Sequence, residues 1–136
     1  MKVYEAAYIA GVIDGEGSIT LTRMHAREHR RPVITIASTD KELLTYLQSI
    51  TGGCISNKKN YKPGKHKNSF TLNIKVKREV FYVLEMIEPY LRINQKKKRA
   101  LWILNNYDRV TNRNGKYTND DLLDKLKFEE EFFAIK

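Results

Sequence analysis

The stretch Ile9-Ala10-Gly11-Val12-Ile13-Asp14-Gly15-Glu16-Gly17-Ser18 decides the fold of this chain. It overlaps a run from Glu5 to Ile13 that is small or apolar at nearly every position, which predicts a helix packed on more than one side. The segment 14–17 is expected to end that helix, because glycine and acidic residues favour turns. From Ser18 the apolar residues alternate with polar ones, so a half-buried strand should follow directly.

Two features of this stretch bear on function. Ala10 and Gly11 leave almost no side chain on one helix face, so a second helix can approach closely. Since the chain holds only one copy of the stretch 9–18, the symmetric partner is the same helix of a second subunit. We therefore expect a homodimer interface at Ala10, Gly11 and Asp14. Asp14 and Glu16 place carboxylates where the helix dipole disfavours negative charge, so a cation would stabilise them. An ordinary helix end with turn chemistry accounts for the same residues on spacing alone.

The rest of the chain indicates an α+β fold. The predicted order is α-β-β-α-β-β-α-α-α, with an antiparallel sheet covered by helices on one side. The strands are expected from Ser18, at 33–38, 54–59 and 70–77, the last two joined by a turn around Pro63-Gly64. Further helices are indicated after a cap at Thr39 and up to Gly52-Gly53, over 80–91 with a break near Pro89, over 95–107, and from Thr118. In the last helix, Thr118 and Asp121 form a capping-box pattern, and the residues expected to pack are Leu122, Leu123, Leu126 and Phe133.

Composition limits the classes of protein. At 136 residues we expect one domain spanning 1–136. Lys and Arg number 25 against 16 Asp and Glu, and this net charge of +9 favours a polyanion, although an anionic membrane surface or an acidic protein would also suit it. The lone Cys54 excludes an intrachain disulfide and a zinc site of paired cysteines, and His25 and His29 lack a clear third ligand. Without a long apolar segment, we expect an intracellular protein.

Residues 9–18 resemble the LAGLIDADG motif, after which a family of homing endonucleases is named. Ile9 and Val12 stand for its leucines, Gly15 for its second alanine and Glu16 for its second aspartate, and the remaining motif residues match outright: Ala10, Gly11, Ile13, Asp14 and Gly17. The segments 39–44 and 88–91 look like two further landmarks of the family. The resemblance covers about 4–107 and implies an αββαββα core with a DNA-binding sheet, followed by a C-terminal helical extension over about 108–136.

The resemblance implies a set of site residues. Glu16 would be the metal-binding acid, the Gly15 carbonyl a further metal ligand, and Asp40 the polar residue beside the nucleophilic water, with Mg²⁺ or Mn²⁺ as the metal. Two copies of Glu16, one from each subunit, would then meet at the dimer axis. Asn94 departs from the family, whose members usually carry a basic residue there. Lys96, one turn away, is the candidate substitute; alternatively, the run 96–99 is solvated or contacts phosphates.

The sheet would read DNA through the side chains on its outer face. A curved antiparallel sheet that fits the major groove presents alternate side chains to the base edges. The residues expected to contact bases are Thr20, Thr22, Thr35, Ser56, Lys58, Thr71, Asn73 and Lys75. The basic turn over 60–67 is expected to contact phosphates.

The leading hypothesis is a sequence-specific, metal-dependent endonuclease that cuts double-stranded DNA at a roughly palindromic site as a homodimer, with no membrane partner and no small-molecule cofactor. An intron-encoded nuclease of this type would be a magnesium-dependent hydrolase. Asn94 motivates the alternative of a catalytically inactive DNA-binding regulator or an RNA splicing maturase on the same scaffold. A membrane-surface protein is a third class, but the basic residues fall on predicted strands and loops and not beside the apolar face of a helix.

Overall fold

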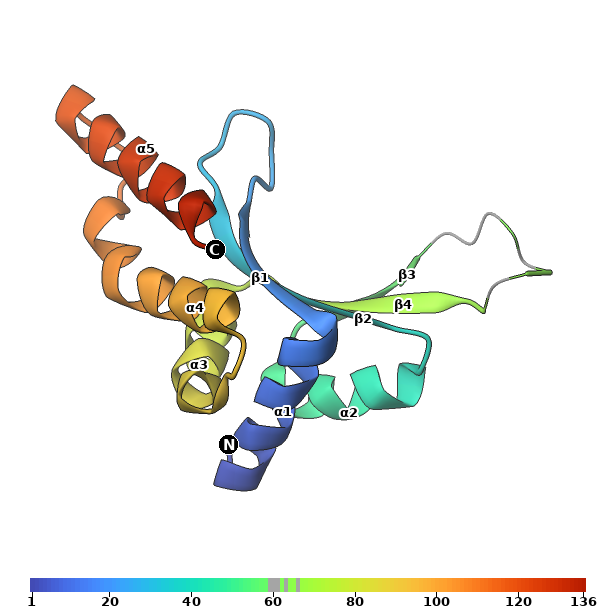
Figure 1. The fold of residues 1–136 in the computed structure, drawn as a ribbon. Coiled ribbons are helices and arrows are strands. Elements are labelled where there is room, and N and C mark those ends of the chain that lie inside the picture. Colours follow the sequence, from blue (N-terminus) through green and yellow to red (C-terminus); the bar gives the residue numbers. More distant parts are fainter. Residues whose placement is uncertain (59–61, 63, 66) are drawn as a thin grey trace.

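The computed structural model describes residues 1–58, 62, 64–65 and 67–136, and its centre is a four-stranded antiparallel sheet (Figure 1). Helices α1 to α4 contact the sheet or one another on one side, and α5 lies outside α4. The elements are α1 (Val3–Glu16), β1 (Gly17–Thr22), β2 (Arg31–Ser38), α2 (Lys41–Thr51), β3 (Cys54–Lys58), β4 (Ser69–Ile74), α3 (Lys77–Ile87), η1 (Glu88–Tyr90), α4 (Asn94–Asn106), η2 (Asp108–Val110) and α5 (Asn119–Ala134). The predicted order of helices and strands is confirmed.

The sheet has the strand order β1-β2-β4-β3, and its register aligns apolar residues across the strands. Ile19 lies opposite Ile34, and Ile34 lies opposite Ile74, so their side chains share one face. All three are at most 1% exposed, because α1 to α4 cover this face. The alternation predicted from the sequence therefore places the hydrophobic core correctly.

The first helix ends within 14–17 as predicted, since Glu16 is its last residue and Gly17 is the extended C-cap. Two other predicted boundaries are wrong. Thr39 does not cap α2; the N-cap residue is Asp40, whose backbone N–H donates to the Ser38 hydroxyl. The strand expected over 70–77 ends at Ile74, since residues from 77 onward already hydrogen-bond as α3.

The glycine pair after α2 behaves as predicted. Gly52 and Gly53 have φ values of +75° and +90°, a region that residues with a Cβ rarely adopt. A Cβ on Gly53 would lie 2.6 Å from the Asn73 carbonyl oxygen on β4. Because the two glycines lack a Cβ, the chain can pass from α2 into β3 while its backbone stays close to β4.

The last helix starts as predicted but packs on a different face. Thr118 is the N-cap of α5 and forms the capping box with Asp121. The residues expected to pack are instead exposed: Leu122, Leu123, Leu126 and Phe133. The buried face consists of Lys125, Phe128, Glu129 and Phe132, because α5 packs on α4 and η2 along that side and Glu129 pairs with Arg30 of the β1–β2 connection. No helix in the described part of the chain combines the length and the apolar character needed to cross a membrane.

Candidate functional site

The carboxyl end of α1 leaves one acid exposed. Glu16 is the last residue of the helix, and within the described part of the chain its carboxylate has no hydrogen-bond or ion-pair partner. Gly15 beside it is also exposed, and a Cβ built there meets no atom within 4 Å. Both predicted metal ligands, the Glu16 carboxylate and the Gly15 carbonyl, therefore lie at an open helix end.

Asp14 has a different role from Glu16, although the two acids are only two residues apart. Its carboxylate accepts the backbone N–H groups of Arg92 at 2.8 Å and Ile93 at 3.1 Å. Ile93 is the N-cap residue of α4, so Asp14 satisfies free donors and places negative charge at the positive end of that helix. Asp14 is thus occupied in joining α1 to α4.

Lys96 makes the reciprocal contact. Its ammonium donates to the carbonyl oxygens of Ile13 and Asp14, each at 2.7 Å, and so supplies positive charge at the carboxyl end of α1. Asn94, the first residue of α4, is exposed. The structure therefore brings three predicted site residues, Asn94, Lys96 and Asp14, to one junction of two helices, next to Glu16.

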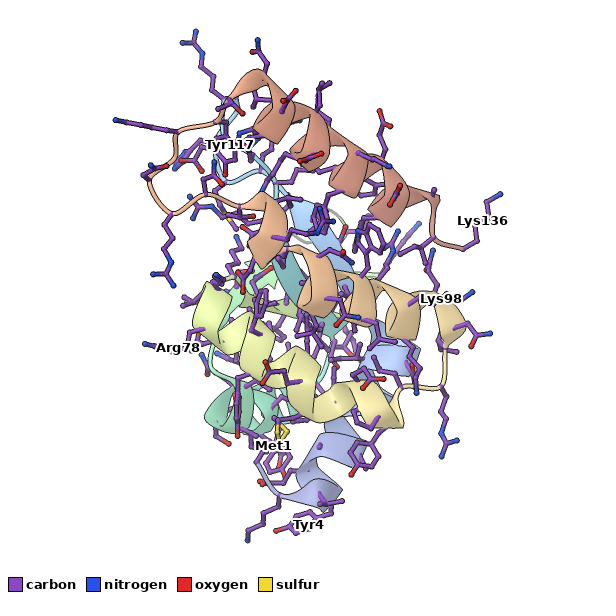
Figure 2. The ribbon with its side chains drawn as sticks, turned by 90° about the vertical axis from the view of Figure 1, so that its left-hand side faces the viewer. Met1, Tyr4, Arg78, Lys98, Tyr117 and Lys136 are labelled. Carbon is purple, nitrogen blue, oxygen red and sulfur yellow. The ribbon has the colours of Figure 1, made fainter. Side chains whose placement is uncertain are left out.

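The basic run 96–99 is not a phosphate-contacting surface as a whole. Arg99 turns inward, where it donates to the Ile19 carbonyl at 3.0 Å, and burial lowers the pKa of its guanidinium. Lys97 lies 3.7 Å from Glu88. Of the four residues 96–99, only Lys98 projects into solvent without a partner among the described residues (Figure 2). The prediction of a solvated or phosphate-contacting run is thus wrong for Lys96 and Arg99, which the packing of α4 against α1 and β1 turns inward.

Asp40 lies apart from this junction. It is exposed at the start of α2 and lines a cavity of about 450 Å³ together with Tyr8 of α1 and with Leu43 and Tyr46 of α2. No contact joins it to Glu16 or Lys96 in the described part of the chain. Nor do three or more His, Cys, Asp or Glu side chains come together anywhere in that part.

The outer face of α1 is open over much of its length. Ala10, expected at a dimer interface, is fully buried in the hydrophobic core of the chain. The exposed positions that follow one another at helical spacing are Tyr4, Ala7, Tyr8, Gly11 and Gly15. A Cβ added to Gly11 meets no atom within 4 Å. The small residues that face outward are thus Ala7, Gly11 and Gly15, whereas Ala10 faces the core.

The helices α1 to α4 cover one face of the sheet and leave the other open (Figure 1). By register and alternation, six of the predicted DNA-contacting residues lie on the open face: Thr20, Thr22, Thr35, Ser56, Thr71 and Asn73. The register places Thr35 opposite Asn73, and Thr71 opposite Ser56. Thr20 and Thr22 alternate with the buried Ile19 and Leu21 of β1 and so point to this open face.

Hydrogen bonds link neighbouring strands across this polar face. The hydroxyls of Ser18 and Thr35 lie 2.6 Å apart, and the Asn73 amide donates to the Ser56 hydroxyl at 3.2 Å. Ser18 and Cys54 share the face and were missed, although the same alternation that marks Thr20 and Ser56 would have found them. These bonds hold the polar side chains in fixed positions.

Three predictions concern the ends of the open face. Lys75 is exposed just beyond β4. Lys58 pairs with Ser69 through its backbone, but its side chain lies outside the described residues. The basic turn over 60–67 falls in part outside them as well.

Comparison with known proteins matches the chain to one family. The model of the LAGLIDADG endonuclease family matches residues 9–102. The intron-encoded DNA endonuclease ai2b of Dictyostelium discoideum is 27% identical over 107 residues, which are 79% of this chain and 40% of that protein. The chain thus spans less than half the length of this curated relative.

Solved structures of homing endonucleases have the same fold. I-CvuI, in complex with a DNA target and Mg, superposes with a TM-score of 0.73 at 18% identity, over 98% of this chain and 82% of that one. I-SmaMI, bound to uncleaved DNA with calcium, superposes with a TM-score of 0.67 at 18% identity, over 96% of this chain but only 45% of that one. With the motif at the end of α1, the open polar sheet and the family model matched over 9–102, the chain belongs to the LAGLIDADG endonuclease family.

Proposed function

We propose that this chain is a homing endonuclease that cuts both strands of a long, roughly palindromic DNA site as a homodimer, using Mg²⁺ or Mn²⁺. The observation that carries the proposal is the end of α1, where the unpartnered carboxylate of Glu16 follows the open face at Gly11 and Gly15. Two such helices packed together bring one Glu16 from each subunit to the axis. Residues 1–136 then act as one domain per subunit, with the core over about 4–107 and the extension over about 108–136.

The donors at this site suit a hard divalent cation. Carboxylate and carbonyl oxygens are the ligands that Mg²⁺ prefers, and Glu16 and the Gly15 carbonyl would supply them from each subunit. The bound metal would lower the pKa of a water molecule and stabilise the charge that develops on the phosphate. Asp14 is held by two backbone N–H groups and so leaves metal binding to Glu16.

Lys96 and Asn94 would hold charge and protons near the cation, whereas Asp40 lies apart at the start of α2 and would contact only the attacking water. Lys96 keeps its ammonium between the carbonyls of Ile13 and Asp14, close to where the cleaved phosphate would bind. Asn94 would donate a hydrogen bond from its exposed amide, and Asp40 would place the attacking water through a hydrogen bond. DNA lies on the open polar face, where Thr20, Thr22, Thr35, Ser56, Lys58, Thr71, Asn73 and Lys75 contact the bases.

Sequence-specific DNA binding and DNA cleavage are tested by one selection experiment. Purified protein is incubated with a library of random palindromic duplexes in Mg²⁺ for cleavage, and in Ca²⁺ for binding. One recovered palindrome that is also cut would support the endonuclease. Glu16→Gln should then abolish cleavage and retain binding, whereas Glu85→Gln, which makes the same change at an exposed residue of α3, should cleave like wild type. Cleavage that survives Glu16→Gln would contradict the role of that residue.

The homodimer is tested separately at Gly11. Gly11→Leu places a large side chain where a built Cβ meets nothing in the same subunit, so the subunit should fold, and the dimer should dissociate. Gly64→Leu makes the same change at another position where a built Cβ meets nothing, and should leave the dimer intact. Sedimentation velocity reports both masses. A Gly11→Leu protein that remains a dimer would refute packing through α1.

Asn94 favours a second candidate, a DNA-binding regulator or a maturase without cleavage activity. Such a protein would bind one palindrome, or an RNA, and give no cut product in Mg²⁺. In that event Asn94→Lys, which restores the usual basic residue at the exposed start of α4, should produce cleavage of the bound duplex. Equal cleavage by wild type and Asn94→Lys would instead show that asparagine is sufficient.

A further inference from the structure

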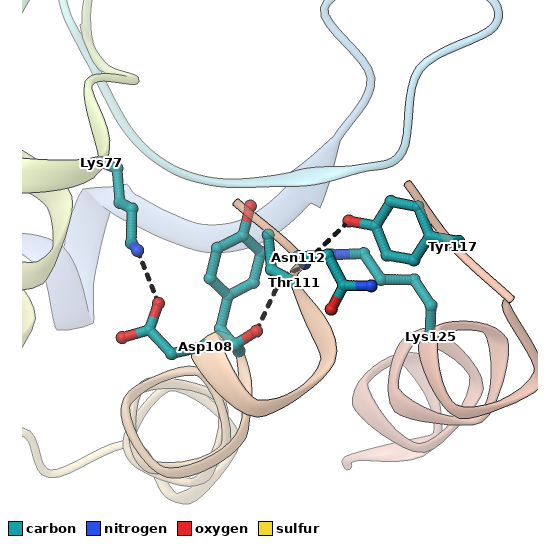
Figure 3. A network of polar contacts seen from close by, with 7 residues as sticks. Lys77, Asp108, Thr111, Asn112, Tyr117 and Lys125 are labelled. Carbon is teal, nitrogen blue, oxygen red and sulfur yellow. Dashed lines mark hydrogen bonds and ion pairs between the residues drawn. The ribbon is translucent and has the colours of Figure 1, made fainter. Parts of the chain in front are cut away.

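A cavity lined by many basic side chains lies between the β1–β2 connection and α5, far from the amino end of α1 (Figure 1). Figure 3 shows Lys77, Thr111, Asn112, Tyr117 and Lys125 from its wall. The cavity has a volume of about 450 Å³ and lies between the β1–β2 connection, the start of α3, the α4–α5 connection and α5. Its basic and histidine side chains are His29, Arg30, Arg31, Lys77, Arg113 and Lys125, against one acid in the wall, Glu28. We refer to it as the Lys125 pocket.

The floor of the pocket is a buried lysine. Lys125 is 1% exposed, and its ammonium donates to the Thr111 hydroxyl at 2.5 Å while lying 4.6 Å from the centre of the Tyr107 ring. No carboxylate lies within ion-pair distance of it in the described part of the chain, since Glu129 pairs with Arg30 at 3.5 Å. Burial lowers the pKa of Lys125 to about 8; the charge of Glu129 opposes this shift, and the charge of Lys77 adds to it to a smaller extent. An anion in the pocket would relieve this unfavourable burial of a cation.

The rim is assembled from exposed cations on separate elements. Arg113 on the α4–α5 connection is exposed and has no ion-pair partner among the described residues. Lys77 at the start of α3 pairs with Asp108 at 2.5 Å, but its side chain is still 58% exposed. Tyr117 and Asn112 add polar groups, with the Asn112 N–H donating to the Tyr117 hydroxyl at 3.2 Å. A tetrahedral anion would thus find donors on several sides.

The pocket shares part of its wall with a cavity at the end of β4. A second cavity, of about 380 Å³, shares Arg31, Lys77 and Tyr107 with the Lys125 pocket and reaches Lys75, beyond the end of β4. Lys75 is one of the residues expected to contact DNA. A basic trough therefore runs from the sheet, past Lys77, to Arg113 and Lys125. A duplex lying on the sheet would bring its backbone toward this trough.

We infer that the Lys125 pocket binds a phosphate group of the DNA backbone in the flank of each half-site, outside the base pairs that the sheet reads. The inference rests on the proposed DNA binding and adds to it a contact made by the C-terminal extension. Because the contact is to phosphate, it adds affinity without selecting a sequence.

The test compares charge-removing variants on the selected duplex in Ca²⁺, with affinity measured across a salt series. Lys125→Met and Arg113→Gln should each weaken binding about fivefold, and each should reduce the salt slope by about two for a dimer with two pockets. The loss should be equal on the selected palindrome and on an unrelated duplex. Lys127→Gln, which removes one charge from the exposed side of the same helix, should bind like wild type. Arg113 lies in an exposed connection, so this variant remains informative if Lys125→Met folds poorly.

The outcomes separate the pocket from the function on which it rests. If wild type binds no duplex, the proposed function fails and the inference fails with it. If wild type binds DNA and both pocket variants match it in affinity and salt slope, the phosphate assignment alone is overturned. Inorganic phosphate is the second probe. If it protects wild type but not Lys125→Met against thermal unfolding while both bind DNA equally, the pocket holds a free anion and not the DNA backbone.

Discussion

The contact of Lys96 with the end of α1 predicts a measurable loss of stability when its charge is removed. The ammonium donates to two backbone carbonyls, each at 2.7 Å. Hydrogen bonds to a charged group contribute about 1.5 to 3 kcal/mol, and a cation at a helix C-terminus about 0.3 to 1 kcal/mol. Because one ammonium makes both bonds and water replaces part of them, we expect Lys96→Met to lower the free energy of unfolding by about 2 kcal/mol.

Lys98→Met is the matched control. It removes the same charge from the same helix, two residues further on, at a side chain that is exposed and unpartnered among the described residues. Its cost should be below about 0.5 kcal/mol. Both variants are compared with wild type by urea unfolding at one protein concentration, since the proposed dimerisation would make stability depend on concentration. Equal stabilities of the two variants would refute the view that Lys96 stabilises α1.

Two further perturbations test other parts of the fold. Gly53→Ala should lower the free energy of unfolding in urea by about 3 kcal/mol or more, because its Cβ would lie 2.6 Å from the Asn73 carbonyl oxygen at φ +90°. Gly115→Ala is the control at φ +68° in open space and should lower it by only about 1 kcal/mol. Equal losses in the two variants would contradict the steric argument. Lys125 has its pKa lowered from 10.5 to about 8, so between these values the folded protein binds fewer protons than the unfolded chain, and wild-type stability should gain from this group as the pH rises through that window. Lys125→Met should lack this gain, and an identical pH dependence would contradict the burial of a charged amine.

The sequence was sufficient to predict the order of the elements, the core face of the sheet and its polar face. These features follow from alternation along each strand, which fixes the side of every residue once one side is buried. The face of α5 was predicted wrongly because Leu122 and Leu126 are more apolar than Lys125 and Glu129. Lys125 can be buried because its ammonium donates to the Thr111 hydroxyl and lies over the Tyr107 ring. Both partners precede α5 in the chain, so the pattern of apolar residues along α5 does not reveal them.

The roles of Asp14 and Lys96 could not be predicted for another physical reason. Both side chains bind backbone atoms of segments about 80 residues away, and a backbone carbonyl or N–H is present at almost every position of a chain. A search for complementary side chains therefore cannot find these contacts. The exposed Glu16 was placed from the motif, while the buried state of Ala10 became clear only when the packing of α1 on the sheet was known.

The exchange of charge between the ends of α1 and α4 has a consequence for how relatives of this chain can diverge. Asp14 meets the N–H groups of Arg92 and Ile93, and Lys96 meets the carbonyls of Ile13 and Asp14, so neither side chain depends on the identity of a particular partner side chain. A replacement at 92 or 93 other than proline leaves the Asp14 carboxylate satisfied, and a replacement at 13 leaves the Lys96 ammonium satisfied. The two contacts would therefore produce no pair of co-varying positions in an alignment of relatives. Position 14 could change while the side chains at 92 and 93 stay the same, and position 96 could change while the side chain at 13 stays the same.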